Sequence, residues 1–298
     1  MYTNPITRLH PTAFILLIDR SGSMGERIVF GGGEMTKARA VSMVAGSFID
    51  ELLFRATREG GVRDYYDIAV LGYSGDGVRS LLSPAGEFTT PSRLAASAVR
   101  RQKISRERLL PSGRTTIAVT EHNVWIEPRA EGATPMCGAL EEALSLAERW
   151  CRAKRNHGSY PPTVINITDG EASDGGADRV GEPAAKIRAT GTDDGHTLLV
   201  NIHLARRDDP FPPVLFPSSP DQLPDNRYAR LLWDISSEMP EGYNDTIAGL
   251  KGLAGLNGLN GLAGRNSNPG PFRAMGFGSH ASDLAAMMNI GSINSVVL

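Results

Sequence analysis

The chain has 298 residues, of which 31 are Lys or Arg and 33 are Asp or Glu, so its formal net charge is −2. A chain so close to neutral has no general attraction for nucleic acid, and we expect neither a DNA nor an RNA partner. Hydrophobic residues make up 41% of the chain and charged residues 21%, which excludes a disordered or membrane-embedded class and is typical of a folded globular protein.

The sequence near the N-terminus predicts neither a membrane anchor nor a leader peptide. Its apolar run, Ala13–Ile18, has six residues, far fewer than the ~20 that a membrane-spanning helix needs. The run ends in Asp19 and Arg20, without the cleavage site of a signal peptide. Cys137 and Cys151 fall on one predicted helix, about 21 Å apart and too far to pair. We therefore expect a cytoplasmic protein with free thiols and no membrane partner.

The first part of the chain predicts strands that alternate with a helix. Thr12–Asp19 is an apolar run that ends in a carboxylate, typical of a strand buried on both faces. A glycine-rich loop at 31–33 precedes a helix expected over 36–58, where apolar residues recur at helical spacing. Asp67–Tyr73 and Val78–Leu82 are predicted to be strands that pair as a hairpin.

Residues 83–130 predict an inserted segment. Six basic residues concentrate between positions 93 and 108, and we interpret them as a solvated helix face, with a patch for phosphate or an acidic partner as the alternative. The alternation in Arg114–Glu127 predicts a hairpin. Its Trp125 is expected to pack on the domain rather than anchor a partner.

The second part of the chain continues the alternation. Thr134 and Pro135 predict a helix start, with a hydroxyl at the N-cap and proline at the first helical position. Gly-Leu-x repeats in 249–263 predict a low-complexity loop over about 245–270. The remaining predicted elements are strands at Thr163–Thr168 and Thr197–Leu204 and helices at Ala184–Ala189, Leu223–Ser237 and Ala281–Asn289.

Strands alternating with helices predict an α/β fold that is doubly wound, with a mainly parallel central sheet, helices on both faces and one antiparallel edge strand. Ligands of such sheets bind beyond the carboxyl ends of the strands. Asp19 and Asp169 each follow a predicted strand at this edge. Two carboxylates in one crevice repel each other unless a positive charge lies between them, and a divalent cation is the simplest such charge.

Three loops contribute oxygen atoms to this crevice. The first is Asp19-Arg20-Ser21-Gly22-Ser23, the second Gly132-Ala133-Thr134-Pro135 and the third Thr168-Asp169-Gly170-Glu171. The set contains hydroxyls and carboxylates without Cys or His, which favours Mg²⁺ or Mn²⁺ over Zn²⁺.

These three motifs, in this order, resemble the metal-ion-dependent adhesion site of von Willebrand factor type A (VWA) domains, including integrin inserted domains. The resemblance implies that Ser21, Ser23 and Thr134 are inner-sphere metal ligands. It also implies that Asp19 and Asp169 supply charge, often through water. It places the strands that end at these two aspartates side by side at the centre of the sheet.

The resemblance implies one domain over 1–298, with a core at about 12–204 followed by C-terminal helices. It further implies that the ion, Mg²⁺ or alternatively Mn²⁺ or Ca²⁺, accepts an Asp or Glu side chain from another protein. The dipole of the helix that starts at Pro135 is expected to favour that carboxylate. We therefore expect a metal-dependent protein-binding module, not an enzyme.

The chain is similar to stand-alone bacterial cytosolic VWA domains such as the tellurium-resistance-associated group. By analogy, this similarity implies a protein kinase, a phosphatase or a chaperone-like ATPase as partner. The alternative is a metal-dependent phosphohydrolase that uses the same acidic crevice. Asp19 resembles an aspartyl-phosphate nucleophile, although Ser21 stands where the haloacid-dehalogenase pattern has a second Asp. Turnover of a generic phosphoester with Mg²⁺ distinguishes these two functions.

Overall fold

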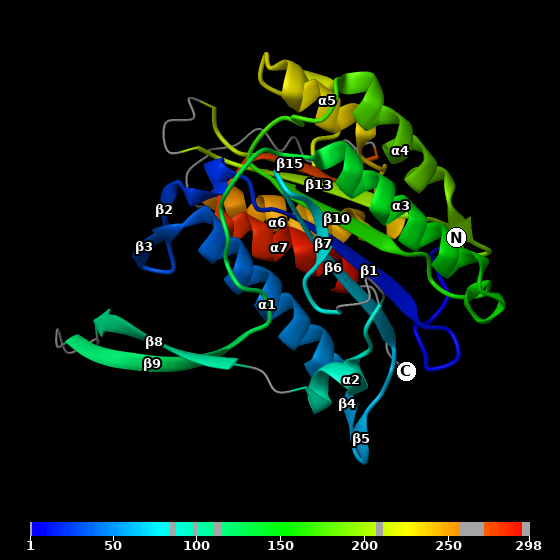
Figure 1. Cartoon of the computed structure of the whole chain (residues 1–298), viewed down its shortest axis with the longest axis horizontal. Coiled ribbons are helices and arrows are strands. Elements are labelled where there is room, and N and C mark those ends of the chain that lie inside the picture. Colours follow the sequence, from blue (N-terminus) through cyan, green and yellow to red (C-terminus); the bar gives the residue numbers. More distant parts are fainter. Residues whose placement is uncertain are drawn as a thin grey trace.

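The computed structural model describes residues 2–83, 88–97, 100–109, 115–206, 211–256 and 271–293. Its centre is a seven-stranded sheet made of β1 (Thr12–Asp19), β6 (Tyr66–Ser74), β7 (Gly77–Ser80), β10 (Thr163–Thr168), β13 (Leu198–Leu204), β14 (Val214–Leu215) and β15 (Met275–Ser279). The strand order is β14-β15-β13-β10-β1-β6-β7 (Figure 1). The five inner strands are parallel, and β7 and β14 pair antiparallel at the two edges.

Helices cover both faces of this sheet (Figure 1). One face carries α1 (Lys37–Ala56), α6 (Asn244–Leu256) and α7 (Ala281–Ile293), and the other carries α3 (Met136–Arg152), α4 (Ala177–Ala189) and α5 (Arg227–Ile235). The short helix α2 (Pro91–Ala96) follows the β6–β7 hairpin. The predicted α/β fold with a mainly parallel sheet is therefore confirmed, except that the sheet has two antiparallel edge strands instead of one.

The predicted strand Thr12–Asp19 has the expected bounds and is buried along its whole length. Its alternate side chains enter the two hydrophobic clusters on either side of the sheet, with Leu16 in one and Leu17 in the other. The continuous apolar run follows from this burial, because neither face of a central strand meets water.

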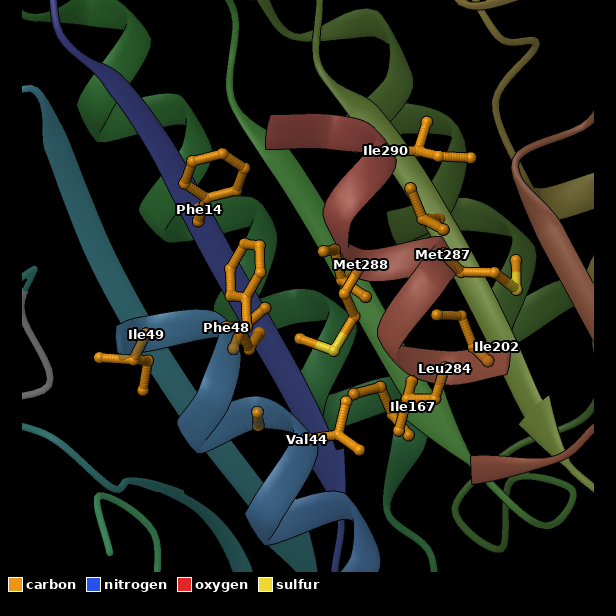
Figure 2. Packing of buried hydrophobic residues seen from close by; sticks show 14 of the residues in the cluster. Phe14, Val44, Phe48, Ile49, Ile167, Ile202, Leu284, Met287, Met288 and Ile290 are labelled. Carbon is orange, nitrogen blue, oxygen red and sulfur yellow. The ribbon is translucent and has the colours of Figure 1, made fainter. Parts of the chain in front are cut away.

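Figure 2 shows the cluster between the sheet and the helices α1 and α7. The ring of Phe14 on β1 meets the ring of Phe48 on α1 edge to face, with centroids 5.3 Å apart. Met287 and Met288 of α7 fill the neighbouring space above β10 and β13, beside Ile202 (Figure 2). Helix α7 thereby covers the part of this sheet face that α1 does not cover.

Four small antiparallel ladders lie outside the central sheet. The loop predicted at 31–33 forms the turn of a hairpin, because Gly31 and Gly32 have positive φ angles of 61° and 83° and reverse the chain, while Gly33 begins the second strand. The ladders are β2 (Arg27–Phe30) with β3 (Gly33–Thr36), β4 (Thr57–Arg58) with β5 (Gly61–Val62), β8 (Arg100–Leu109) with β9 (Thr115–Val124), and β11 (Gly191–Thr192) with β12 (Gly195–His196).

The basic segment 93–108 is not the predicted helix face. Its first residues belong to α2, and its remainder forms β8, which pairs with β9 over ten register positions, from Arg100↔Val124 to Leu109↔Thr115. The hairpin predicted over 114–127 is therefore wrong in its bounds, because residues 115–124 form the single strand β9 and the other strand of the hairpin is β8. Figure 1 shows the β8–β9 hairpin extending away from the central sheet, beyond α1.

The C-terminal third differs most from the sequence prediction. The loop expected at about 245–270 begins as helix α6, and residues 257–270 lie outside the described part. Ile247 is fully buried in the core beside Tyr243, and this burial offsets the low helix propensity of the glycines. Strands β14 and β15, which were not predicted, extend the sheet beyond the expected core range.

Two predicted helices have different bounds. The helix expected over 223–237 begins only at Arg227, because Asn226 caps it by accepting hydrogen bonds from the amides of Tyr228 and Ala229. The helix expected over 184–189 begins earlier, at Ala177. Cys137 and Cys151 both lie on α3 and are buried and unpaired, as predicted. Among the described residues, no helix combines the length and hydrophobicity required to cross a membrane.

Candidate functional site

The strands that end at the two predicted aspartates are neighbours. β1 and β10 pair in parallel with Ile18 opposite Ile167, so Asp19 and Asp169 leave the sheet at the same edge. The chain continues from β1 to α1 on one face and from β10 to α4 on the other (Figure 1). This divergence is the topological switch point at which doubly wound sheets bind ligands.

A continuous chain of polar contacts joins the first and third loops at this edge. The amide of Ser21 donates to Asp19 Oδ1 at 2.8 Å, and Ser21 Oγ lies 3.1 Å from Ser23 Oγ. Ser23 Oγ then donates to Asp169 Oδ1 at 2.6 Å. Asp19, Ser21 and Asp169 are buried, whereas Ser23 is exposed. Four of the five predicted site residues therefore lie together, with the hydroxyl of Ser23 at the surface.

The second loop joins this cluster through its main chain. The amide of Gly22 donates to the carbonyl of Gly132 at 2.9 Å. The amide of Thr134 donates to Ser173 Oγ at 2.9 Å, and the amide of Ser173 donates back to the carbonyl of Thr134 at 2.9 Å. In the part of the chain described, the hydrogen bonds of Thr134 are all made by its backbone. The fifth predicted residue is thus held at the same edge with its hydroxyl uncommitted.

Close backbone packing fixes the second loop on the β6–β7 turn. Gly132 has a φ angle of +73°, and a Cβ atom there would lie 2.8 Å from the amide nitrogen of Gly75. A Cβ atom on Gly75 would lie 2.9 Å from the nitrogen of Ala133. Only glycine fits both positions, so the two turns define the position of the loop that carries Thr134.

The start of α3 differs from the prediction. The helix begins at Met136, and Pro135 at the capping position makes no side-chain cap. Asp174, from the loop after β10, supplies the cap by accepting from the amides of Cys137 at 3.0 Å and Gly138 at 2.9 Å. Burial alone would raise the pKa of Asp174, but these amide hydrogen bonds outweigh burial and the pKa is lowered. The first amides of α3, which were expected to favour the carboxylate of a partner protein, therefore already bind Asp174.

Lys37 is the site residue that the sequence prediction missed. It is 0% exposed, and its Nζ lies 3.1 Å from Asp169 Oδ2 and 2.5 Å from Glu26 Oε2. A signal was present in the sequence, because Lys37 begins the helical stripe that continues with Val41 and Val44 into the core. A lysine on a stripe of buried apolar residues indicates a buried ion pair.

Asp19, at the end of β1, is a second enclosed carboxylate of the crevice beside Asp169. It is 1% exposed, and its second oxygen accepts from Thr168 Oγ1 at 2.8 Å. Burial raises the pKa of Asp19, although the hydrogen bonds from Ser21 and Thr168 lower it in part and the charge of Asp169 raises it further. A carboxylate in this environment gains from a neighbouring positive charge.

The residues present fit a divalent cation in two respects. In an octahedral Mg²⁺ site with bonds of about 2.0–2.1 Å, adjacent oxygens lie ~3 Å apart, and the 3.1 Å between Ser21 Oγ and Ser23 Oγ matches that spacing. The charges of Asp19, Asp169 and Glu26 exceed that of Lys37 by two, which one divalent ion would balance. Within the described ranges, no group of three or more His, Cys, Asp or Glu residues could hold a metal, so the hydroxyls are essential to any such site.

No family model matches this sequence, and no curated protein matches it. Similar solved structures include a von Willebrand factor type A protein from Catenulispora acidiphila, with 16% identity, a TM-score of 0.39 and coverage of 66% of this chain and 34% of that one. They also include the vWF domain of the type V pili tip protein Mfa5 from Porphyromonas gingivalis, with 17% identity, a TM-score of 0.31 and coverage of 55% and 39% respectively. The TFIIH p34 N-terminal domain has 12% identity, a TM-score of 0.35 and coverage of 66% and 83%.

The chain spans about a third of the length of the Catenulispora protein, 34%. All three TM-scores are below 0.5. The functional assignment therefore depends on the residues of this chain and not on these likenesses.

Proposed function

We propose that this chain is a metal-dependent protein-binding module of the VWA type, which holds Mg²⁺ at its three-loop edge and captures an acidic side chain of a partner protein. Ser21, Ser23 and Thr134 would be the inner ligands, and Asp19 and Asp169 would supply charge from behind them. Mn²⁺ and Ca²⁺ are alternative ions. A protein kinase, a phosphatase or an ATPase remains the predicted class of partner.

The polar chain from Asp19 through Ser21 and Ser23 to Asp169 is the observation that carries this proposal. Both serine oxygens can still accept a hydrogen bond or bind a cation, because a hydroxyl that donates its proton, as Ser23 does to Asp169, keeps its lone pairs. Hydroxyl oxygens on rigid supports, backed by carboxylates, form a hard oxygen site. The arrangement supports a site whose inner ligands are mostly neutral.

The neutral charge of the proposed hydroxyl ligands determines which groups of a partner protein the site would attract. A cation held mainly by hydroxyls would keep residual positive charge at the surface and attract a carboxylate. Since Asp174 occupies the first amides of α3, the helix terminus adds little to that attraction. Capture of an acidic side chain would therefore depend on the metal.

The geometry of Asp19 argues against the alternative phosphohydrolase. A nucleophilic carboxylate must reach the phosphorus atom of its substrate. Asp19 is 1% exposed, with one oxygen bound by the amide of Ser21 and the other by Thr168. It is placed to support the loop rather than to attack a substrate.

The proposal is tested by calorimetric titration of the chelator-treated protein with Mg²⁺, followed by titration of the metal-loaded protein with an acidic peptide. We expect Mg²⁺ to bind the wild type and not Asp19→Ala, and the peptide to bind only with metal present. Ser47→Ala, a hydroxyl deletion on the exposed side of α1, should bind like the wild type. Unchanged affinity in Asp19→Ala would contradict the site. Hydrolysis of p-nitrophenyl phosphate with Mg²⁺ that Asp19→Ala abolishes would favour the alternative.

A further inference from the structure

Lys37 occupies a position that disfavours lysine on two grounds. It is the first residue of α1, where a positive charge opposes the helix dipole, and it is 0% exposed. Burying an ammonium group is unfavourable unless it is paired and hydrogen-bonded. Residues that break local rules in this way are concentrated at functional sites.

The ammonium group is held by carboxylates from two different loops. It contacts Glu26 Oε2 at 2.5 Å and Asp169 Oδ2 at 3.1 Å. The amide of Lys37 also donates to the carbonyl of Glu26 at 2.9 Å, which fixes the start of α1 against the first loop. Ser23 binds the other oxygen of Asp169. Asp169 is therefore held from one side by a hydroxyl and from the other by a positive charge.

We propose that Lys37 is a positioning residue that acts as the fixed counter-charge of this site. Its ammonium group holds Asp169 beside Ser23 in the absence of metal, and its charge weakens the binding of a divalent cation. This inference rests on the proposed function and deepens it, because it makes the metal exchangeable instead of permanently bound.

The sign of the effect follows from the charges. Without Lys37, the charges of Asp19, Asp169 and Glu26 would be less compensated, and their mutual repulsion would favour a divalent ion more strongly. With Lys37, one unit of that charge is already balanced before any ion arrives. The group is enclosed, so solvent ions screen its repulsion on the incoming cation only weakly. Lys37 therefore has two distinct effects. It holds Asp169 in place without metal, and it lowers the affinity of the site for metal.

The test is calorimetric titration with Mn²⁺ of the wild type, of Lys37→Met and of Arg39→Met, all treated with chelator. Arg39 is exposed on the same turn of α1, so its variant loses the same charge without touching the site. We expect Lys37→Met to bind Mn²⁺ at least about tenfold more tightly than the wild type, and Arg39→Met to bind equally. Thermal unfolding should show a lower metal-free midpoint for Lys37→Met and a larger rise on adding Mn²⁺.

Lys37→Met alone leaves Glu26 without its ammonium partner and could fail to fold. Glu26→Gln and the double variant Lys37→Met with Glu26→Gln reduce this problem, because the double variant leaves one carboxylate, Asp169, without the ammonium partner instead of two. The double variant should bind Mn²⁺ at least about tenfold more tightly than Glu26→Gln alone. Equal or weaker binding by the variants that lack Lys37 would overturn the inference.

The outcomes separate this inference from the proposed function. Binding to the wild type with no gain in the Lys37 variants overturns the role of Lys37 and leaves the metal site intact. Binding to the Lys37 variants alone supports the counter-charge and contradicts metal use by the wild type. Binding to none of these proteins overturns both.

Discussion

At the scale of single residues, the candidate site combines an enclosed frame with an exposed face. Asp19, Asp169 and Lys37 are buried, while the Ser23 hydroxyl that they support is open to solvent. Long-range contacts hold the frame, because the bond from Thr168 to Asp19 spans 149 positions of the sequence. The position of the exposed Ser23 side chain therefore depends on enclosed side chains that a partner protein cannot touch.

Thr168→Val tests how much the buried hydrogen bond to Asp19 stabilises the site, and it does so without changing the shape of the side chain. The substitution removes the hydroxyl that donates to Asp19 Oδ2 at 2.8 Å. We expect a loss of about 1–3 kcal/mol in the free energy of unfolding, because a buried carboxylate oxygen loses a donor. Urea denaturation at pH 7 measures it. Thr168→Ser keeps the hydroxyl and should keep most of the stability, and an equal loss in both variants would assign the effect to packing.

Asp174→Ala tests the cap of α3. Loss of the capping carboxylate should lower the free energy of unfolding at pH 7 by about 1 kcal/mol. The pKa of Asp174 is lowered in the folded protein, so its contribution is present above the unfolded value of about 3.9 and is lost as the pH falls through the folded value.

Chemical denaturation of wild type and Asp174→Ala at pH 7 and pH 3 checks this dependence. The difference between the two proteins should be smaller at pH 3. Asp178→Ala on the first turn of α4 is a control that leaves the α3 cap in place. A difference that grows toward acid pH would show that the carboxylate does not stabilise the helix in its charged form.

The sequence motifs contain the residues of the candidate site that the structure brings together, but not the residues that hold them in place. Short motifs that can be recognised in the sequence contain Ser21, Ser23 and Asp169. The structure places these three residues in contact. Lys37 and Asp174 act through partners 132 and 37 positions away, so the helical stripe of Lys37 indicates a buried ion pair but does not identify Asp169 as the partner. Such roles depend on tertiary packing, which periodicity alone does not reveal.

At the scale of elements, strands with apolar runs were predictable, and β15, with two glycines among five residues, was not. Thr12–Asp19 and Thr163–Thr168 have the predicted bounds. Strand β15 has the sequence MGFGS, and its two glycines lower the strand propensity that a sequence pattern can detect. Gly276 has a packing role instead, because a Cβ atom there would meet the side chain of Met287 on α7.

Gly276→Ala tests that packing. A Cβ atom at Gly276 would lie 2.6 Å from Met287 Sδ and 2.5 Å from Ser279 Oγ. We expect a loss of about 1–3 kcal/mol in the free energy of unfolding from this overpacking. Gly181→Ala in the middle of α4, where a Cβ atom meets nothing within 4 Å, should instead stabilise the protein by up to about 1 kcal/mol. Thermal or urea unfolding of both variants distinguishes a tight contact from open space.

At the scale of the whole molecule, the strand order creates the site. β1 and β10 are adjacent, and the chain leaves them toward opposite faces of the sheet. The first and third loops diverge at this point, while the second loop reaches it from the start of α3 through the bond between Gly22 and Gly132. Three segments distant in sequence therefore meet at one edge. The alternation of strands and helices predicted this for the first and third loops, and the motif resemblance implied it for the second.

Metal binding should stabilise the whole fold if it occurs at this edge. A ligand that binds only the folded state stabilises it by about 2.7 kcal/mol at a concentration of 100 times its Kd. Thermal unfolding of the chelator-treated wild type should therefore shift to a higher midpoint on adding Mg²⁺, whereas Asp19→Ala should not shift. An equal shift in both proteins would place the ion elsewhere.

The most direct test of the metal site is anomalous diffraction from crystals of the protein grown with Mn²⁺. One anomalous peak is predicted within bonding distance of the hydroxyls of Ser21 and Ser23, with Thr134 completing the protein ligands. The absence of a peak there from well-diffracting crystals, or a peak only at another part of the molecule, would contradict the account.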